Sequence, residues 1–365
     1  MSEEKEFDKI LIGIKNIGNT CYINSLTQCL IHTEPFRKLI LDKNNLIKMN
    51  YNILNNTKNL INGEIINITY ICNRLKKKLS YYLIILFENY INNQIISSRK
   101  YVERICDNEI FEFGVQNDCQ ELFTYIINKL KEELKDEVNI DLNNNILNIY
   151  NTLDINNDIK TKLIDLEKMI NRDFSIVTTP FLSISDTVVK CECNYESHIF
   201  DIPIQLQLNL IGDDKIINMK DCLNDYYNEI KCEEYKCSNC NNITELKKQE
   251  YIWLAPQILV IHLKRFITSF ENGIYSQKKI HTIVKYEEIL DMSKYMIDKN
   301  REYKYELYGM CNHFGSLNGG HYYSHIKKNN IWYCFNDDKI FKLDKNDHLD
   351  NKHAYLLFYE LKKNE

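Results

Sequence analysis

The sequence predicts an α+β protein, because helical patterns fill its first half and strand patterns fill its second half. Apolar residues recur at helical spacing from Cys21 to Leu30, and another apolar stripe runs through the segment 118–134. Beyond residue 173 the pattern changes to short β-branched or alternating runs. Helices that precede strands favour an α+β chain over alternating βαβ units.

The expected elements follow in order along the chain. Residues 36–110 are predicted to be mostly helical, with Asn-rich breaks, and residues 118–134 are predicted to form one amphipathic helix. Residues 136–172 are rich in Asn and Asp but still carry spaced Ile and Leu, which indicates an insertion rather than a linker. The predicted strands are 187–189, 202–210, 258–263, 332–335 and 355–359.

Composition limits the classes of function. The chain has 365 residues, of which 44% are hydrophobic, so it can bury a large core in one or two domains. Its formal net charge of −5 argues against a general nucleic-acid binder, which would carry a basic surface. A partner with a basic surface fits this charge, although net charge says little about any one patch.

The N-terminal residues and the cysteine content together indicate in which cellular compartment the protein resides. Residues 1–10 are acidic and polar, so we expect a solvated tail and no secretory signal. The longest apolar run, Tyr81–Phe87, is too short to span a bilayer. We therefore expect a soluble protein of the cytoplasm, the nucleus or both. For its thirteen cysteines, metal binding or catalysis is expected in preference to disulfides.

Cys21 is the candidate nucleophile. The segment 16–30 reads NIGNTCYINSLTQCL, in which Asn19 and Thr20 are N-cap residue types that would place Cys21 on the first turn of a helix. The positive end of a helix favours thiolate, and its N–H groups, with the Asn16 side chain, would hold an oxyanion. A lone cysteine is more often a small buried apolar residue. We give that structural role to Cys29, Cys72, Cys106, Cys222, Cys232, Cys311 and Cys334.

His321 is the candidate base among nine histidines. It follows Gly319 and Gly320, and glycines let a peptide approach the backbone closely. Fifteen residues later, Asn336 and Asp337 end a predicted strand, where a polar side chain can orient the imidazole and select its tautomer.

Four blocks of the chain together resemble the ubiquitin-specific protease family. The cysteine box of that family is similar to GIKNIGNTCYINSLTQCL, and its histidine box to NHFGSLNGGHYYSHI with IWYCFNDDKIF and AYLLFY. Two intermediate motifs are similar to VQNDCQELF (Val115–Phe123) and LAPQILVIHLKRF (Leu254–Phe266). The blocks stand in the family order from about residue 13 to 359, so the resemblance covers nearly the whole chain.

The resemblance implies a papain-like cysteine protease fold with a helical thumb, a β-sheet palm and β fingers. After a tail of residues 1–10, a single catalytic domain would span 11–362. Its thumb would cover about 11–172, with the insertion at about 136–172. The fingers would cover about 185–250, and the palm about 174–184 and 251–362.

The resemblance also implies roles for individual residues. Cys21 is the nucleophile, His321 the base, Asn336 the third member of the triad, Asp337 a secondary orienting group and Asn16 the oxyanion donor. The residues implied to bind substrate are Gln116, Asp118, His313, Phe314, Gly319, Gly320 and Tyr322. Among them Asp118 would face an arginine of the ubiquitin tail, a charge-assisted contact. Gly319 and Gly320 would line a channel that admits Gly-Gly.

The expected activity is a thiol-dependent deubiquitinase that hydrolyses the isopeptide or peptide bond after the last glycine of ubiquitin. Its partners would be ubiquitin and ubiquitinated proteins, with no nucleic acid and no membrane, and the chain would be a monomer. Two alternatives stay open. The chain could be a protease for a ubiquitin-like modifier, or a non-catalytic scaffold that binds ubiquitin.

Two cysteine pairs predict a structural zinc site. Cys191-x-Cys193 and Cys237-x2-Cys240 supply four thiolates, the usual ligand set of a closed tetrahedral zinc site. The ubiquitin-specific proteases often carry such a zinc at the tip of the fingers.

The first pair departs from the C-x2-C spacing of that family. The context of Cys193 matches the second cysteine, which leaves Cys191 one position out of register. His198 or Cys232 could take its place, although Cys191 is preferred, and four reduced cysteines without metal are the plain alternative.

Overall fold

The computed structural model describes residues 7, 9–42, 77–94, 96–134, 157–211, 216–271, 274–316, 319–344, 347, 349 and 352–362. The chain divides into two compact units. The first unit consists of residues 1–138, 173–180 and 308–348, and the second of 139–172, 181–307 and 349–365. The predicted thumb, palm and finger boundaries remain predictions.

Helices make up most of the first unit. They are α2 (Cys21–His32), α3 (Glu34–Leu41), α6 (Leu79–Ile91), α7 (Arg99–Ile105) and α8 (Cys119–Glu133), with the 3-10 turn η1 (Ile176–Phe181) at the boundary. The predicted helices at 21–30 and 118–134 are thus confirmed. Asp118 caps α8 by accepting a hydrogen bond from the Gln120 N–H at 2.6 Å. Glu133, at the end of α8, accepts from the N–H groups of Leu79 and Ser80 and so caps α6.

An antiparallel sheet completes the first unit. Its strands, in order, are β12 (Lys304–Ser316, of which residues from 308 belong here), β13 (Gly319–Lys328), β14 (Ile331–Asn336) and β15 (Lys339–Lys342). Phe314 pairs with His321, and Ser324 with Phe335. The helix α2 packs on β13, and every residue of α2 except His32 is buried. The predicted strand at 332–335 is confirmed as part of β14.

The N-terminal segment is not a solvated tail throughout, as the sequence had suggested for residues 1–10. Residues 1–6 and 8 lie outside the described residues, but Phe7 is only 8% exposed. The Arg37 guanidinium carbon lies 3.6 Å from the centre of the Phe7 ring, and Lys328 Nζ lies 4.4 Å from it. Lys328 also donates to the carbonyls of Phe7 and Ile10. Cation–π contacts and hydrogen bonds therefore hold this segment against the first unit.

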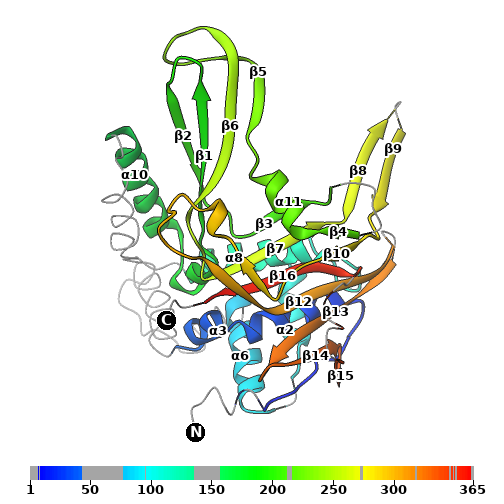
Figure 1. Ribbon diagram of the computed structural model, residues 1–365. Helices are drawn as coiled ribbons and strands as arrows, with labels where there is room; N and C mark the ends of the chain where they lie inside the picture. Colours follow the sequence, from blue (N-terminus) through cyan, green and yellow to red (C-terminus); the bar gives the residue numbers. More distant parts are fainter. Residues whose placement is uncertain are drawn as a thin grey trace, which may run out of the picture. The chain divides into compact units, whose positions relative to one another are not determined.

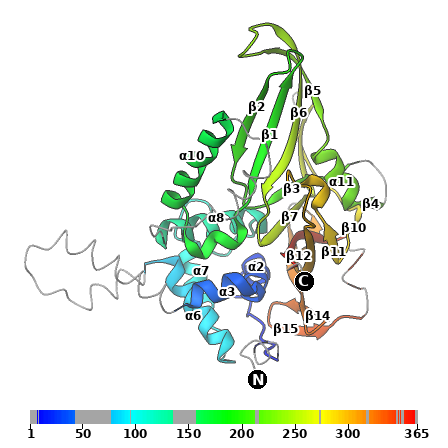
Figure 2. The ribbon, with the colours of Figure 1, turned by 60° about the vertical axis from the view of Figure 1, so that its left-hand side comes forward.

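The second unit contains a long antiparallel sheet of four strands. Their order is β2 (Glu196–Asp201), β1 (Ile184–Cys191), β6 (Ile243–Leu254) and β5 (Ile230–Lys236), and both views show these strands side by side (Figures 1 and 2). Val188 pairs with His198 on one side and with Gln249 on the other. The predicted strand at 187–189 is confirmed as the middle of β1.

The remaining strands of the second unit form smaller groups. β7 (Ile258–Lys264) pairs antiparallel with β16 (Ala354–Leu361) and parallel with β3 (Leu206–Asn209). The predicted strands at 258–263 and 355–359 are confirmed. The one predicted at 202–210 is too long, because Pro203 lacks an N–H and the chain bends at 204–205 before β3 begins.

Five further strands and two helices complete the second unit. β4 (Ile216–Asn218) pairs with β10 (Ile283–Lys285), β8 (Phe266–Glu271) with β9 (Ile274–Lys279), and β11 (Ile289–Asp291) with the start of β12. The helices are α10 (Asn157–Asp173) and α11 (Met219–Tyr226), with the 3-10 turn η2 (Ser293–Tyr295). The expected insertion at 136–172 therefore ends in a helix, whereas residues 135–156 lie outside the described part of the chain.

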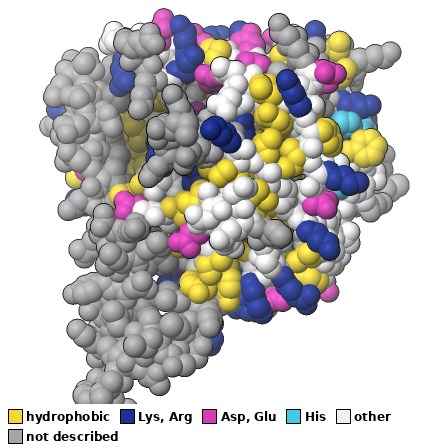
Figure 3. All heavy atoms as spheres, turned by 90° about the horizontal axis from the view of Figure 1, so that it is seen from below, with side chains coloured by type: hydrophobic (Ala, Val, Ile, Leu, Met, Phe, Trp, Pro, Cys, Tyr) yellow, Lys and Arg dark blue, Asp and Glu magenta, His cyan; other side chains and the backbone are white. Residues whose placement is uncertain are grey.

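The surface carries charges of both signs. On the face drawn in Figure 3, the described Lys and Arg side chains are dispersed among acidic, polar and hydrophobic ones and are not gathered in one stripe. Within the described residues, no helix has the length and apolar character needed to cross a bilayer.

Candidate active site

Cys21 is the first residue of α2 and is 1% exposed. Thr20 occupies the N-cap position and Cys21 the first turn, as predicted, although the Thr20 side chain makes no capping bond. Its hydroxyl instead accepts from the Ile17 N–H at 3.1 Å and donates to Asn16 Oδ1 at 3.3 Å. Asn19 adopts φ 51° and donates to the Gly114 carbonyl. Bonds within this loop, rather than a side-chain cap, therefore position the start of α2.

Asn16 and Asp337 join the loop before Cys21 to the turn after β14. Asn16 Oδ1 accepts from the N–H groups of Gly18 and Thr20, both at 3.1 Å, and Asn16 Nδ2 donates to Asp337 Oδ2 at 3.1 Å. The other carboxylate oxygen of Asp337 accepts from Asn24 Nδ2 at 2.8 Å. The main-chain carbonyl of Asp337 accepts from the Ile14 N–H at 2.9 Å.

Sequence reasoning did not single out Asn24, although it is 2% exposed and also donates to the Ile14 carbonyl. The available signal was its position three residues after Cys21, on the same face of the helix. A polar side chain buried on that face needs hydrogen-bond partners, and the Asp337 turn supplies one of them.

His321 lies on β13 and interacts with both of its predicted neighbours, Cys21 and Asn336. One ring nitrogen, Nε2, lies 2.6 Å from Asn336 Oδ1 at the end of β14. A hydrogen bond with the Cys21 thiol, then the bond to Asn336 and the charge of Asp337, outweigh burial and raise the pKa of His321 from 6.5 to about 9. The imidazole is therefore protonated at neutral pH. A positively charged ring beside Cys21 favours the thiolate form, which is the form that attacks.

The predicted substrate-binding residues lie around this group in the first unit. Gln116 bonds to the backbone of Gly320, which directly precedes His321. His313 and Tyr322, which are both buried, have ring centres 4.5 Å apart, whereas Phe314 is 59% exposed. A Cβ on Gly320 would fall 2.6 Å from the Phe314 carbonyl oxygen, so only glycine fits there, whereas a Cβ on Gly319 would meet nothing within 4 Å.

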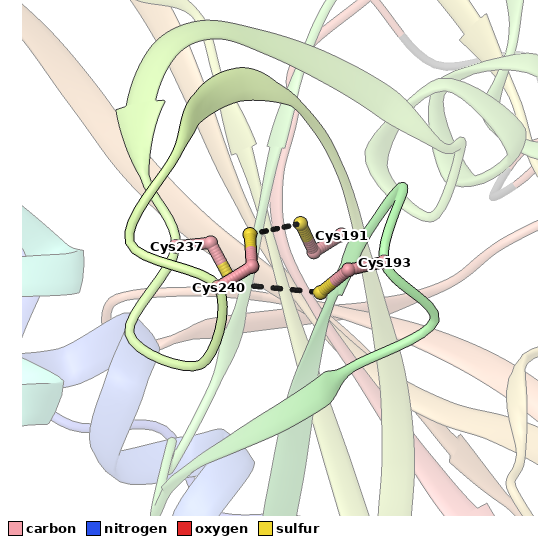
Figure 4. Close-up of side chains that lie close together, drawn as sticks. All are labelled: Cys191, Cys193, Cys237 and Cys240. Carbon is pink, nitrogen blue, oxygen red and sulfur yellow. Dashed lines mark hydrogen bonds between the residues drawn. The ribbon is translucent and has the colours of Figure 1, made fainter.

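The second unit gathers the four predicted zinc ligands (Figure 4). The sulfur atoms of Cys191, Cys193, Cys237 and Cys240 all lie within 4.8 Å of one another, and two of the separations are 3.9 and 3.8 Å. A tetrahedral zinc with Zn–S bonds of about 2.3 Å has S–S edges of about 3.8 Å. The four thiols therefore fit a zinc ion.

Hydrogen bonds to sulfur support the same fit. The Asn239 N–H donates to Cys237 Sγ at 3.4 Å, and Asn239 Nδ2 donates to Cys193 Sγ at 3.8 Å. Backbone N–H groups, that of Cys240 first, lower the pKa of the Cys237 thiol to about 6. Such donors stabilise thiolate ligands.

Local turns accommodate the unusual C-x-C spacing. Asn194 follows the first pair at φ 63°, and Asn241 follows the second at φ 57°, so each pair sits in a turn that ends in a left-handed asparagine. His198, the predicted substitute ligand, instead bonds to Asp186 through Nδ1 at 2.8 Å. Cys232 is not part of the four-cysteine group.

The fold and the Cys–His–Asn series define a cysteine hydrolase of the papain-like kind. A family model described as ubiquitin carboxyl-terminal hydrolase matches residues 12–359. The chain belongs to this family, which is the one that the four sequence blocks resemble. The predicted family, the α+β fold class and the cysteine-type ubiquitinyl hydrolase class are thereby confirmed.

Individual relatives agree with this assignment. A probable ubiquitin carboxyl-terminal hydrolase of Acanthamoeba polyphaga mimivirus is 26% identical over 430 residues, which cover 96% of this chain and 90% of that protein. Ubiquitin carboxyl-terminal hydrolase 5 of Saccharomyces cerevisiae is 26% identical, and number 25 of Arabidopsis thaliana 28% identical. The matches cover 96% and 95% of this chain but only 45% and 47% of those two proteins, so the chain spans less than half of their length.

Solved structures share the fold. The yeast SAGA DUB module matches with a TM-score of 0.69 at 23% identity, covering 100% of this chain and 71% of that chain. The SAGA Ubp8/Sgf11/Sus1/Sgf73 DUB module bound to ubiquitin aldehyde matches with the same TM-score and identity, over 100% of this chain and 72% of that one.

Proposed function

We propose that this chain hydrolyses the isopeptide or peptide bond that follows the C-terminal glycine of ubiquitin. The observation that carries the proposal is the grouping of Cys21, His321 and Asn336 in one compact unit, where Cys21 raises the pKa of His321 and Asn336 Oδ1 lies 2.6 Å from the His321 ring. Family membership supplies the substrate class, because relatives across nearly the whole chain are named ubiquitin carboxyl-terminal hydrolases.

The chemistry follows from these contacts. The Cys21 thiolate attacks the carbonyl carbon of the last glycine, and the protonated His321 then gives its proton to the leaving lysine amine. Water, activated by the now neutral His321, hydrolyses the thioester and frees the thiol. Asn336 accepts a hydrogen bond from the imidazole and so holds its orientation through both steps.

The oxyanion of each tetrahedral intermediate needs N–H donors. The start of α2 directs its N–H groups toward the position of Cys21, and we assign the second donor to Asn16, as the sequence predicted. Asn16 Nδ2 also donates to Asp337, which itself raises the pKa of His321. Asp337 therefore serves as the secondary orienting group that links the oxyanion donor to the base.

Recognition of the ubiquitin tail is assigned to the residues around Gly320. Asp118 would bind an arginine of the tail, and Phe314, being exposed, offers an apolar surface to it. Burial of Tyr322 and His313 means that these rings shape the site rather than protrude into it.

Reaction with a ubiquitin that carries a cysteine-reactive electrophile at its C-terminus tests the proposal. We expect one adduct, located by mass spectrometry on Cys21, and none with matched probes built on ubiquitin-like modifiers. An adduct with a modifier probe alone would identify the chain as a protease for that modifier. Folded protein that reacts with no probe would instead indicate a non-catalytic scaffold.

We also propose that Cys191, Cys193, Cys237 and Cys240 hold a structural zinc ion. The match between the sulfur separations and a tetrahedral zinc site supports it. With four protein ligands, the ion has no open position for chemistry and would fasten the end of β1 to the turn between β5 and β6.

Cys237→Ser is expected to reduce bound zinc from about one equivalent to near zero and to lower the thermal midpoint by about 10 °C, because metal binding contributes several kcal/mol to folding. Cys232→Ser, on β5 but outside the group, is the matched control and should retain both. Metal analysis and thermal unfolding give the two readouts. Equal zinc in the Cys237 variant, or zinc loss in the Cys232 variant, would contradict the ligand set.

We further propose a monomer in a reducing compartment, the cytoplasm or the nucleus. The twelve cysteines of the described residues form no disulfide, which supports such a compartment. Light scattering measures the molar mass of the purified chain in solution and so tests whether it is a monomer.

A further inference from the structure

Gln116 makes a contact pattern that binding of the ubiquitin tail does not explain. Its amide bonds to both backbone groups of Gly320: Oε1 accepts from the Gly320 N–H at 3.1 Å, and Nε2 donates to the Gly320 carbonyl. These are the two bonds that a neighbouring strand would make with that residue. The side chain thus takes the place of a strand at the residue before His321.

The same nitrogen also reaches the nucleophile. Gln116 Nε2 lies 3.9 Å from Cys21 Sγ and donates a hydrogen bond to it. An amide nitrogen carries two hydrogens, so it can serve the Gly320 carbonyl and the sulfur together. One side chain therefore connects the nucleophile at the start of α2 with the strand that carries the base.

The surroundings make this connection rigid. Gln116 lies two residues before Asp118, the N-cap of α8, so its backbone is anchored at the start of that helix. Gly320 has no room for a Cβ, because such an atom would fall 2.6 Å from the Phe314 carbonyl oxygen. The backbone groups that Gln116 binds therefore belong to a residue confined by its own neighbours on β12.

We propose that Gln116 is a catalytic residue of the hydrolysis, whose amide N–H stabilises the negative charge on the Cys21 sulfur and holds that sulfur beside the His321 strand. The inference rests on the proposed function, and it gives Gln116 a different role from the substrate contact that the sequence resemblance implies. Hydrogen bonds to charged groups are the strong ones, so loss of this bond slows steps that need the thiolate.

The test separates thiolate chemistry from ubiquitin binding. Iodoacetamide alkylates a thiolate without any ubiquitin contact, and mass spectrometry of the Cys21 peptide measures its rate. For Gln116→Ala we expect this rate and kcat for a fluorogenic ubiquitin substrate each to fall about 10- to 100-fold, with little change in KM. Gln120→Ala is the matched control, a half-buried glutamine whose amide bonds to Thr124, and both of its rates should equal those of the wild type.

Each other outcome has a defined meaning. A higher KM with unchanged kcat and unchanged alkylation would show that Gln116 only binds substrate, which overturns the inference. Rates for Gln116→Ala equal to those for Gln120→Ala would overturn it as well. Should the alanine variant fail to fold, the isosteric Gln116→Glu replaces it, and wild-type alkylation in that variant would again refute the role.

If the proposed deubiquitinase function is wrong, the experiments give a different result from the one expected when only the Gln116 inference is wrong. Wild-type protein that does not hydrolyse the ubiquitin substrate would refute the deubiquitinase assignment. The alkylation rates would still decide whether Gln116 acts on the Cys21 sulfur, because that reaction does not depend on ubiquitin.

Discussion

Replacing Cys21 with alanine is expected to abolish hydrolysis of ubiquitin substrates, with a loss of kcat of about 10⁶-fold, the size seen when a triad nucleophile is removed. The reason is that, among the described thiols, Cys21 alone both begins α2 and raises the pKa of His321. Ubiquitin affinity should remain, because a small side chain that is 1% exposed contributes little contact area. Turnover of a fluorogenic ubiquitin substrate and calorimetric titration with ubiquitin measure the two quantities.

A second cysteine serves as the control for this prediction. Cys106 is half-buried after α7, and Cys106→Ala should keep both turnover and affinity. Turnover of the Cys21 variant at the wild-type rate would show that another residue is the nucleophile. Loss of ubiquitin affinity along with turnover would show instead that the substitution disturbs the fold of the site.

Replacing His321 with alanine is expected to cost nearly as much, because nucleophile and base act as one unit and removal of either alone costs about 10⁶-fold in kcat. His281→Ala, on an exposed histidine of the second unit, is the matched control and should leave kcat unchanged. A residual rate within tenfold of the wild type would assign the proton transfer to another group.

The pH dependence provides a finer test of the same residue. The pKa of His321 is raised from 6.5 to about 9, so the imidazole is protonated at neutral pH and loses its proton as pH rises through about 9. The leaving amine needs that proton. We therefore expect kcat/KM to stay constant from neutral into mildly alkaline pH and to decrease around pH 9.

The variant Asn336→Ala should change the pH at which kcat/KM falls on the alkaline side. It removes the hydrogen bond at 2.6 Å that helps to raise the pKa of His321, so the alkaline fall should move to lower pH. We also expect kcat to drop about 10- to 100-fold, the usual worth of a hydrogen bond to a charged group. An alkaline limb that stays at its wild-type pH in this variant would show that Asn336 does not act on the imidazole.

Much of the site could be predicted because its signals are local. Apolar spacing placed Cys21 at the start of a helix, and the glycines and the strand pattern placed His321 at the start of another element. The C-x2-C pair and its partner likewise predicted a group of four sulfurs. Periodicity and short-range spacing determine where each of these residues lies on its own element or turn, since they depend on neighbours within one or two turns of the chain.

The contacts that hold the site together could not be predicted in this way. Asp337 joins Asn16 and Asn24, and the second of these partners is 313 residues away in the sequence. Gln116 pairs with Gly320 across 204 residues. No pattern along the chain encodes which distant amide meets which carboxylate or carbonyl, because the folded backbone decides which groups come within hydrogen-bonding distance.

Two further details depend on the same cause. Thr20 holds the predicted N-cap position, but its hydroxyl bonds to Asn16 and Ile17 instead of capping the helix. Phe7 follows a polar stretch and was expected in solvent, yet Arg37 and Lys328 pack on its ring, which is buried. The sequence by itself determined the reacting residues, the family and the order of the elements. Only the tertiary structure decided how asparagine, glutamine and aspartate side chains brace those residues, because their partners are chosen by proximity in space.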